Sequence, residues 1–279
     1  LDMRNALVIA VSQSGTTTDT NRAVDLAIAR GAFVHAIVNR RGSDLVRKAH
    51  SVLFTSDGRD IEMSVASTKA FYAQLVAGDL TALFLADHLR TLSPLEIARA
   101  VRDLETLPER MERVLAMGGE IGAVAAEFAP TSRYWAVVGS GVNNVSAMEI
   151  RIKLSELCYK SIPVDYTEDK KHIDLSTEPL TLVMASDVGP ELLGDLVKEV
   201  AIFRAHNGKP IVFATEGGAA EAVATHAKAV VPLPKIGSGL GFILAAAAGH
   251  LFGLHSARAI DAGALDLRLV LNALGEAAT

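Results

Sequence analysis

Short apolar runs alternate along this chain with longer segments in which apolar residues recur every three to four positions. The first pair shows the pattern: residues 6–11 indicate a buried parallel strand, and residues 21–30 have the spacing of a helix. Strands that alternate with helices of this length are typical of βαβ units and parallel sheets. The predicted strands are residues 6–12, 33–39, 51–55, 134–139, 180–186, 210–215 and 229–233, and the predicted helices are residues 21–30, 64–89, 94–104, 109–128, 146–159, 191–206 and 240–259.

A faint internal repeat accompanies this alternation. Residues 7–15 (LVIAVSQSG) can be laid over residues 181–189 (TLVMASDVG), and each stretch precedes a helix, a glycine and a second strand. The repeat predicts two related Rossmann-like α/β domains. We place the first, with a helical connector, at residues 1–129 and the second at residues 130–279. Because the chain starts at Leu1 and lacks the strand and loop that normally open such a domain, we expect the first domain to be truncated at its N-terminus.

A hydroxyl-rich loop, residues 12–17 (SQSGTT), lies between the first predicted strand and the first predicted helix. Unpaired backbone N–H groups and the positive end of the helix dipole meet at such a point, which favours a bound anion. The loop has no lysine and no G-x-G-x-x-G pattern, so it is neither a Walker loop nor a dinucleotide fingerprint. Neutral hydroxyls suit one phosphate monoester. Simple capping of the helix by serine and threonine is the alternative explanation.

Composition narrows the classes of partner. The net charge is −5 without a basic stripe, which argues against nucleic acid and anionic membranes. The longest apolar stretch, residues 242–254, is short and interrupted by Gly and His, so we expect no membrane span. Cys158 is the single cysteine, which excludes a disulfide within the chain and indicates a reducing, cytoplasmic location. No histidines are spaced as metal ligands, so we expect neither a metal nor another cofactor.

Two further polar segments accompany helices. The predicted helix at residues 64–89 opens with SVASTKA, where Ser64 or Ser67 could cap the helix or approach the same anion as the first loop. A polar loop at residues 166–174 contains His172, which could act as a general acid or base. An exposed loop without a chemical role is the alternative. Cys158 and Trp135 are expected to be buried.

Three charged residues share one face of the helix predicted at residues 146–159. Glu149, Lys153 and Glu156 follow each other at i, i+4 and i+7. Two carboxylates beside an ammonium supply a base, its charge partner and a means of tuning its pKa. The alternative is a solvated ladder of ion pairs. The helix follows the end of a predicted strand, which is where open parallel sheets bind ligands.

Residues 12–20 (SQSGTTTDT) and 65–71 (VASTKAF) resemble the motifs of the SIS (sugar isomerase) family, and most of all the isomerase half of the glutamine–fructose-6-phosphate aminotransferases. The resemblance extends from residue 5 to about residue 261. The isomerase half in that family consists of two SIS domains in tandem, which fits the internal repeat. The resemblance therefore implies two tandem SIS domains here.

The resemblance also assigns roles to individual residues. It implies that the phosphosugar contacts are made by Ser12, Gln13, Ser14, Thr17, Val65 and Ser67. The family pattern A-x-E-x-x-x-K-x-x-E matches residues 147–156. Glu156 would then move a proton between C1 and C2, Lys153 would stabilise the developing negative charge, and Glu149 would support the site. His172 matches the family's K-H-G-P loop and would open the sugar ring, across a dimer interface.

The implied activity is that of a sugar-phosphate isomerase unit acting on fructose 6-phosphate or glucosamine 6-phosphate. The implied partners are a second copy of the chain and a glutaminase domain, in the same polypeptide or separate. Three departures from the family pattern stand against this: Thr16 replaces a glutamate, Ile173-Asp174 replaces Gly-Pro, and no lysine that could form a Schiff base follows Lys235. A phosphosugar-sensing module without catalysis and an amino-sugar phosphate deaminase are the alternatives.

Overall fold

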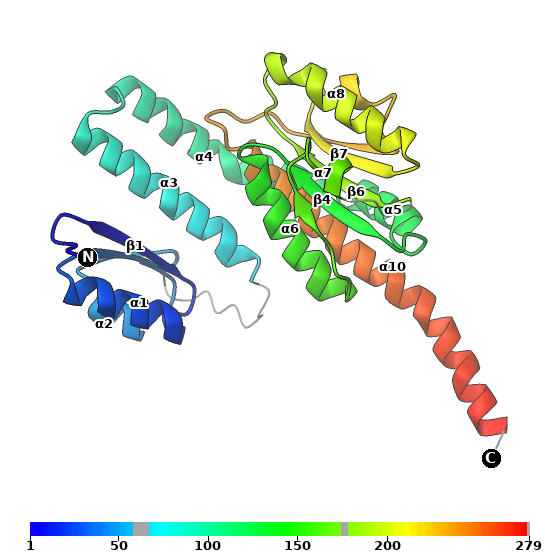
Figure 1. Cartoon of the computed structure of the whole chain (residues 1–279), viewed down its shortest axis with the longest axis horizontal. Coiled ribbons are helices and arrows are strands. Elements are labelled where there is room, and N and C mark those ends of the chain that lie inside the picture. The colour runs from blue at the N-terminus through cyan, green and yellow to red at the C-terminus, as the bar shows by residue number, and fades with distance from the viewer. Residues whose placement is uncertain (58–66, 174–177, 278–279) are drawn as a thin grey trace. The chain divides into compact units, whose positions relative to one another are not determined.

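The computed structural model describes residues 1–57, 67–173 and 178–277 (Figure 1). The chain forms two compact units, Leu1–Val101 and Arg102–Thr279. Each contains a sheet whose strands all pair in parallel, with helices against it, which confirms the α/β class predicted from the sequence. Among the described residues, no helix has the length and apolar character needed to cross a membrane.

The first unit is built on a sheet with the order β1-β2-β3. Its strands and helices are β1 (Leu7–Ser12), α1 (Thr18–Ala29), β2 (Phe33–Val38), α2 (Asp44–Lys48), β3 (Ser51–Phe54) and α3 (Lys69–Leu89). Alternate residues of β1 and β2 point to α1, and its Val24 packs with Ala10 and Val34 in the core of this unit. The apolar runs of the sequence thus place the end of β1 directly beside the start of α1.

The second unit has a sheet with the order β5-β4-β6-β7-β8. Its strands are β4 (Trp135–Gly139), β5 (Val164–Asp165), β6 (Leu180–Ala185), β7 (Lys209–Thr215) and β8 (Ala229–Leu233). Its helices are α5 (Gly118–Phe128), α6 (Asn143–Cys158), α7 (Lys170–Ile173), α8 (Pro190–Ala205), α9 (Gly218–Val223) and α10 (Gly241–Ala277). One face of the sheet packs against α8 and α9, where Val200 and Phe203 contact Val183 and Val212. On the other face, Phe252 of α10 lies edge-on to Phe213 of β7.

Helix α4 (Pro94–Ala116) corrects one prediction. Residues 94–104 and 109–128 were expected to form two helices meeting near Pro108, but α4 continues through that proline and α5 follows it. Proline removes one hydrogen bond from a helix interior. The continuous helix buries Leu107 and Val114 on one face, and this packing offsets the lost hydrogen bond.

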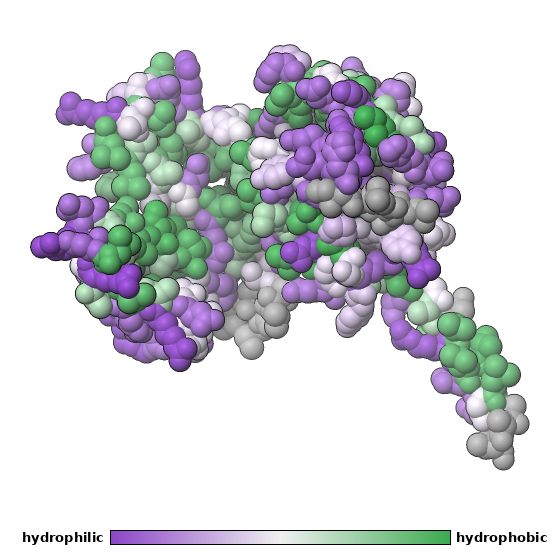
Figure 2. Space-filling view, viewed as in Figure 1, coloured by the Kyte–Doolittle hydropathy of each residue, from purple (hydrophilic) through white to green (hydrophobic). Residues whose placement is uncertain are grey.

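Helix α10 is longer than the predicted helix at residues 240–259. It continues to Ala277, and its last turns expose Leu267, Leu271 and Leu274, the apolar end of the chain in Figure 2. Residues in this segment keep good helix propensity after the buried face of α10 has ended. The predicted helix at residues 64–89 is described only from Lys69 onward, as α3.

Gly249 allows α10 to pack closely on α6, and this yields a test of the fold. A Cβ at Gly249 would lie 2.5 Å from Cδ1 and from Cγ1 of Ile150, whose side chain is fully buried. We expect Gly249→Ala to lower the free energy of unfolding by about 1–3 kcal/mol, measured by urea denaturation. Gly263→Ala is the control, because a Cβ there meets open space and alanine favours the helix. A Gly249→Ala variant as stable as the parent would contradict this close packing.

Candidate functional site

The hydroxyl loop after β1 is a tight turn held by its own serines. Ser12 Oγ accepts a hydrogen bond of 2.9 Å from the backbone N–H of Gly15, and Ser14 Oγ accepts one of 3.0 Å from Thr16 Oγ1. Gly15 has φ +64°, and a Cβ there would lie 2.2 Å from Ser43 Oγ, so the turn requires glycine. A hydroxyl that accepts in this way keeps its own proton, which it can donate to an anion.

The N-terminus of α1 follows this turn. Thr17 is its N-cap residue, is exposed, and makes no side-chain capping hydrogen bond, so its hydroxyl does not serve the helix end. The buried Asn21 fixes the turn from α1, since its Nδ2 donates to the carbonyls of Gly15 and Thr17 at 3.1 and 3.0 Å. The first amides of α1 have no intrahelical acceptor, so they remain available to an anion.

The other predicted contacts of the first unit lie near the start of α3. Val65 lies outside the described residues, as does Ser64. Ser67 is half-buried and precedes the N-cap residue of α3, which is Thr68, so the suggestion that Ser67 caps this helix is wrong. Its predicted role in sugar binding stays a prediction, and so does that of Gln13, whose carbonyl accepts the backbone N–H of Asn39 at 3.2 Å.

In the second unit, α6 carries a buried charged cluster. Lys153 Nζ lies 3.0 Å from Glu149 Oε1, and Nε2 of His250, on α10, lies 3.1 Å from the same oxygen. The three side chains are only 8%, 12% and 10% exposed, in the order Lys153, Glu149, His250. This burial excludes a solvated ladder of ion pairs for Glu149 and Lys153.

The charge state of Glu149 follows from its surroundings. Burial alone would raise the pKa of this carboxyl, because the charged form loses hydration. The hydrogen bonds from His250 and Lys153 outweigh that effect and hold the pKa below its usual value. An ionised carboxylate only accepts hydrogen bonds, so Nε2 of His250 carries a hydrogen and its N–H donates a hydrogen bond to Glu149.

Glu156 differs from Glu149 and Lys153, because it is exposed and has no polar partner among the described residues. At about 100° per residue from Ile150, which contacts α10, Lys153 is rotated by about 60° and Glu156 by about 120°. Glu149 is rotated by about 100° in the same sense, so the three residues lie on one side of α6, with Glu156 two turns beyond Glu149. The predicted shared face therefore holds for all three residues, and only their burial differs, because Glu149 and Lys153 are largely buried and Glu156 is exposed.

His172 lies on the short helix α7 and is exposed. Its neighbours attach this segment to α8: Lys171 forms an ion pair with the buried Glu199, and Lys170 Nζ lies 5.2 Å from the centre of the Phe203 ring. A polar segment that carries an exposed histidine is thus held on a fixed support.

The two residues expected in the core are buried. Trp135 is 3% exposed, and its Nε1 donates to the carbonyl of Ser132 at 2.8 Å. Burial raises the pKa of the Cys158 thiol to about 11. Cys158 is therefore a neutral thiol at neutral pH, not a nucleophile.

The carboxyl ends of β4 and β6, the switch point of the second sheet, are closed by internal contacts. Asn143 Nδ2 donates to the carbonyl of Ser186 at 2.8 Å, and Ser186 Oγ donates to Asn143 Oδ1 at 2.6 Å. Asp187 Oδ2 accepts the backbone N–H of Gly241, the first residue of α10, at 2.9 Å. A carboxylate of the chain itself therefore occupies the N-terminus of α10.

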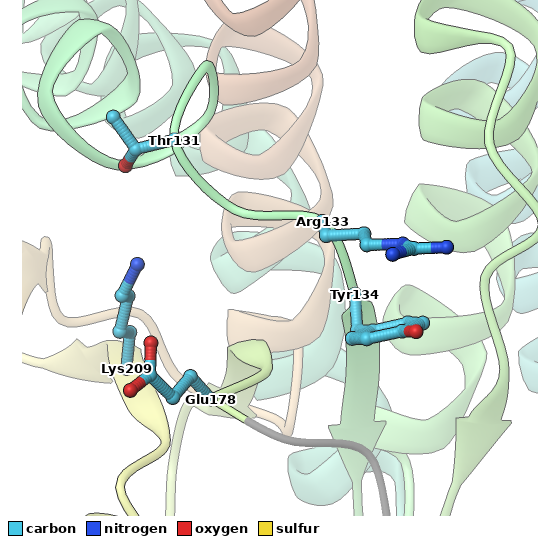
Figure 3. Close-up of a pocket in the computed structure, with 5 residues that line it drawn as sticks. All are labelled: Thr131, Arg133, Tyr134, Glu178 and Lys209. Atoms are coloured by element: carbon cyan, nitrogen blue, oxygen red, sulfur yellow. The ribbon is translucent and has the colours of Figure 1, made fainter.

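A surface pocket of about 380 Å³ lies at the amino ends of the strands of the second sheet (Figure 3). Its lining residues are Thr131, Arg133, Tyr134, Glu178 and Lys209. Figure 3 shows the Glu178 carboxylate beside the Lys209 side chain, with Arg133 and Tyr134 pointing together to another side. Parallel sheets bind ligands at the carboxyl ends of their strands, whereas this pocket lies at the amino ends. It includes none of the residues predicted for the site.

Residues 3–84, which include the hydroxyl loop and the start of α3, match the sequence profile of the SIS domain. This part of the chain is a SIS domain.

Curated relatives of the chain extend the similarity beyond that domain. The isomerizing glutamine–fructose-6-phosphate aminotransferase of Mycolicibacterium smegmatis is 37% identical over 238 residues, which are 84% of this chain and 37% of that protein. The enzyme of the same name from Streptomyces coelicolor is 37% identical over 236 residues, 83% of this chain and 38% of that protein. The chain thus spans less than half the length of these relatives. They confirm the resemblance inferred from the sequence.

Solved structures share the fold of the chain. The C-terminal domain of glucosamine-fructose-6-phosphate aminotransferase from Francisella tularensis gives a TM-score of 0.82 at 23% identity, covering 91% of this chain and 71% of that one. Tagatose-6-phosphate ketose/aldose isomerase from Escherichia coli gives 0.68 at 20% identity, covering 90% and 67%. At these identities the likeness establishes the arrangement of strands and helices alone.

Sequence reasoning missed one member of the charged cluster. His250 belongs to a long apolar helix, 101 positions after Glu149, and no local spacing connects the two. The only signal was a histidine within an otherwise apolar segment. A buried imidazole needs a polar partner, so this histidine implied that a polar partner exists, but the sequence did not identify which residue it is.

Proposed function

We propose that this chain binds fructose 6-phosphate or glucosamine 6-phosphate and interconverts the ketose and aldose forms, as the isomerase unit of a glutamine–fructose-6-phosphate aminotransferase-like protein. The observation that carries the proposal is the buried ion pair of Lys153 and Glu149, one turn before the exposed Glu156 on the same helix. A fixed cation beside an accessible carboxylate is what proton transfer next to a carbonyl requires. The relatives that carry this enzyme's name support the choice of substrate.

In this mechanism each group has one task. Ser12, Ser14 and Thr17 bind the phosphate together with the first amides of α1. Glu156 removes a proton from C1 of the open-chain ketose, a double bond forms between C1 and C2, and the C2 carbonyl oxygen takes up a proton to give the enediol. The C1 hydroxyl then loses its proton as the C1 carbonyl forms, and Glu156 returns its proton to C2. Lys153 stabilises the negative charge that develops on the carbonyl oxygen.

Two further residues prepare the reaction. Glu149 holds Lys153 in place by its ion pair. His172, exposed on α7, transfers the proton that opens the sugar ring. Gln13, Val65 and Ser67 complete the contacts to the sugar and its phosphate.

A phosphosugar-sensing role without catalysis is the second candidate function. It is favoured by residues 236–279, which contain no lysine, so no imine can form there with the ketose carbonyl. Isomerisation through an enediol does not need that imine, whereas the aminotransferase reaction of the family uses it. The isomerase function is therefore preferred.

The proposal extends to the assembly of the protein. We infer that the second unit is a second SIS domain, because the likeness to the Francisella tularensis domain covers 91% of the chain. We expect a homodimer, a glutaminase domain in the same polypeptide or separate, and a cytoplasmic location. Sedimentation equilibrium that detects only monomer would contradict the homodimer.

Loss of the loop hydroxyls tests the phosphate site. The double variant Ser14→Ala, Thr17→Ala is expected to raise the Kd for fructose 6-phosphate by about 100-fold or more, since each hydrogen bond to a charged group contributes about 1.5–3 kcal/mol. Isothermal titration calorimetry measures the change. Thr106→Ala is the control, because that hydroxyl donates to the carbonyl of Asp103 within α4. An unchanged Kd in the double variant would refute the site.

A further inference from the structure

His250 is the member of the charged cluster to which no role has been given. It comes from α10, its side chain is 10% exposed, and its Nε2 lies 3.1 Å from the carboxylate oxygen that also receives Lys153. We propose that His250 is a positioning residue for the isomerisation: it fixes the Glu149 carboxylate and, through it, the Lys153 ammonium. This inference rests on the function proposed for α6.

The need for a second donor follows from the geometry of α6. Glu149 and Lys153 are an i, i+4 pair on one helix, so their ion pair alone connects the carboxylate to nothing outside α6. Both side chains are flexible, so this pair alone holds neither in one rotamer. A hydrogen bond from a different helix removes the freedom of the Glu149 carboxylate to rotate.

The helix that carries His250 is itself held firmly where this residue lies. Gly249, its neighbour, packs against Ile150 of α6. One turn further, Phe252 contacts the ring of Phe213 in the sheet, with ring centres 6.1 Å apart. Near the start of α10, Ser146 Oγ donates to the carbonyl of Phe242 at 2.6 Å. The part of α10 that carries the imidazole is therefore held in place by packing and hydrogen bonds, which is what a positioning residue requires.

The expected effect falls on turnover and not on binding. The phosphate loop belongs to the first unit and does not contain His250. Without the imidazole, Glu149 Oε1 keeps only Lys153, the carboxylate can turn, and the ammonium shifts with it. A misplacement of about 1 Å at a catalytic group can cost about 100-fold in rate.

Three variants separate positioning from general packing. His250→Leu is expected to slow deuterium incorporation into fructose 6-phosphate in D₂O by about 10- to 100-fold, with a Kd within about twofold of the parent. His250→Gln places an amide N–H near the position of Nε2 and is expected to restore most of the rate. The control His255→Leu alters another histidine of α10, which packs at Gly122 of α5, and is expected to leave the rate unchanged. Equal losses in the leucine and glutamine variants, or a loss in His255→Leu, would overturn the proposal.

A structural comparison decides the proposal even if the parent chain does not turn over substrate. Crystal structures of the parent and of His250→Leu are compared at Glu149 Oε1 and Lys153 Nζ. A shift of at least about 1 Å at either atom is expected, with α6 and α10 otherwise unchanged. If both atoms stay in place, His250 is not a positioning residue. If they shift and the parent incorporates no deuterium, the isomerase function fails and the positioning role of His250 stands.

Discussion

Glu156→Gln is expected to slow isomerisation by about 10²- to 10⁴-fold while leaving the affinity for phosphosugar unchanged. Glutamine has the shape of glutamate but cannot take up a proton. Because Glu156 is exposed and unpaired within the described residues, its replacement costs the fold little. The measurement is an NMR time course of fructose 6-phosphate in D₂O, which follows deuterium at C1 and C2 and the formation of glucose 6-phosphate.

The matched control for this variant is Glu221→Gln, which neutralises an exposed glutamate on α9. It is expected to keep the parent's rate. If the parent itself exchanges no deuterium yet still binds the sugar phosphate, the sensing function replaces the isomerase function. If Glu156→Gln turns over as fast as the parent, another group is the base.

Lys153→Met is expected to lower the free energy of unfolding by about 3–5 kcal/mol. The change removes the ammonium and leaves the Glu149 carboxylate buried with His250 as its remaining donor. Because that donor stays, we expect a loss near the lower end of the range. Urea denaturation measures it.

Two comparisons separate this effect from the loss of any ion pair. Lys48→Met breaks the more exposed pair with Asp25, at 2.8 Å, and is expected to cost no more than about 1 kcal/mol. The double variant Glu149→Leu, Lys153→Met removes both charges and is expected to recover most of the stability. A single Lys153→Met variant that loses as little as Lys48→Met would contradict the burial of the cluster.

Much of the fold follows from local sequence patterns. Residues 33–39 were predicted as a strand and β2 spans Phe33–Val38, because a buried parallel strand is a continuous apolar run. The two-residue strand β5 was not predicted, since Val164–Asp165 is too short to show any pattern. Pro108 shows that a local pattern can also mislead. Proline favours a break in a helix, but α4 continues through it because one face of the helix is buried.

For the candidate site too, local sequence spacing predicted some features and not others. The pairing of Glu149 with Lys153 could be predicted, because i, i+4 neighbours meet on any helix. Glu149 and Glu156 lie on the same side of α6, so the exposure of Glu156 depends on which turns of that side are covered, and the donor from His250 depends on a contact across 101 positions. Both are properties of helix packing, which no spacing within α6 encodes.

The carboxylate of Asp187 at the start of α10 and the hydroxyl loop at the start of α1 have different thermodynamic consequences. The Asp187 carboxylate is part of the chain, so its contribution to the stability of the folded state does not change with ligand concentration. A counter-charge that must be recruited stabilises the folded state by an amount that grows with the concentration of free ligand. Phosphosugar is therefore expected to stabilise the start of α1 by an amount that grows with its concentration, whereas the contact of Asp187 with the start of α10 contributes the same amount at every sugar concentration.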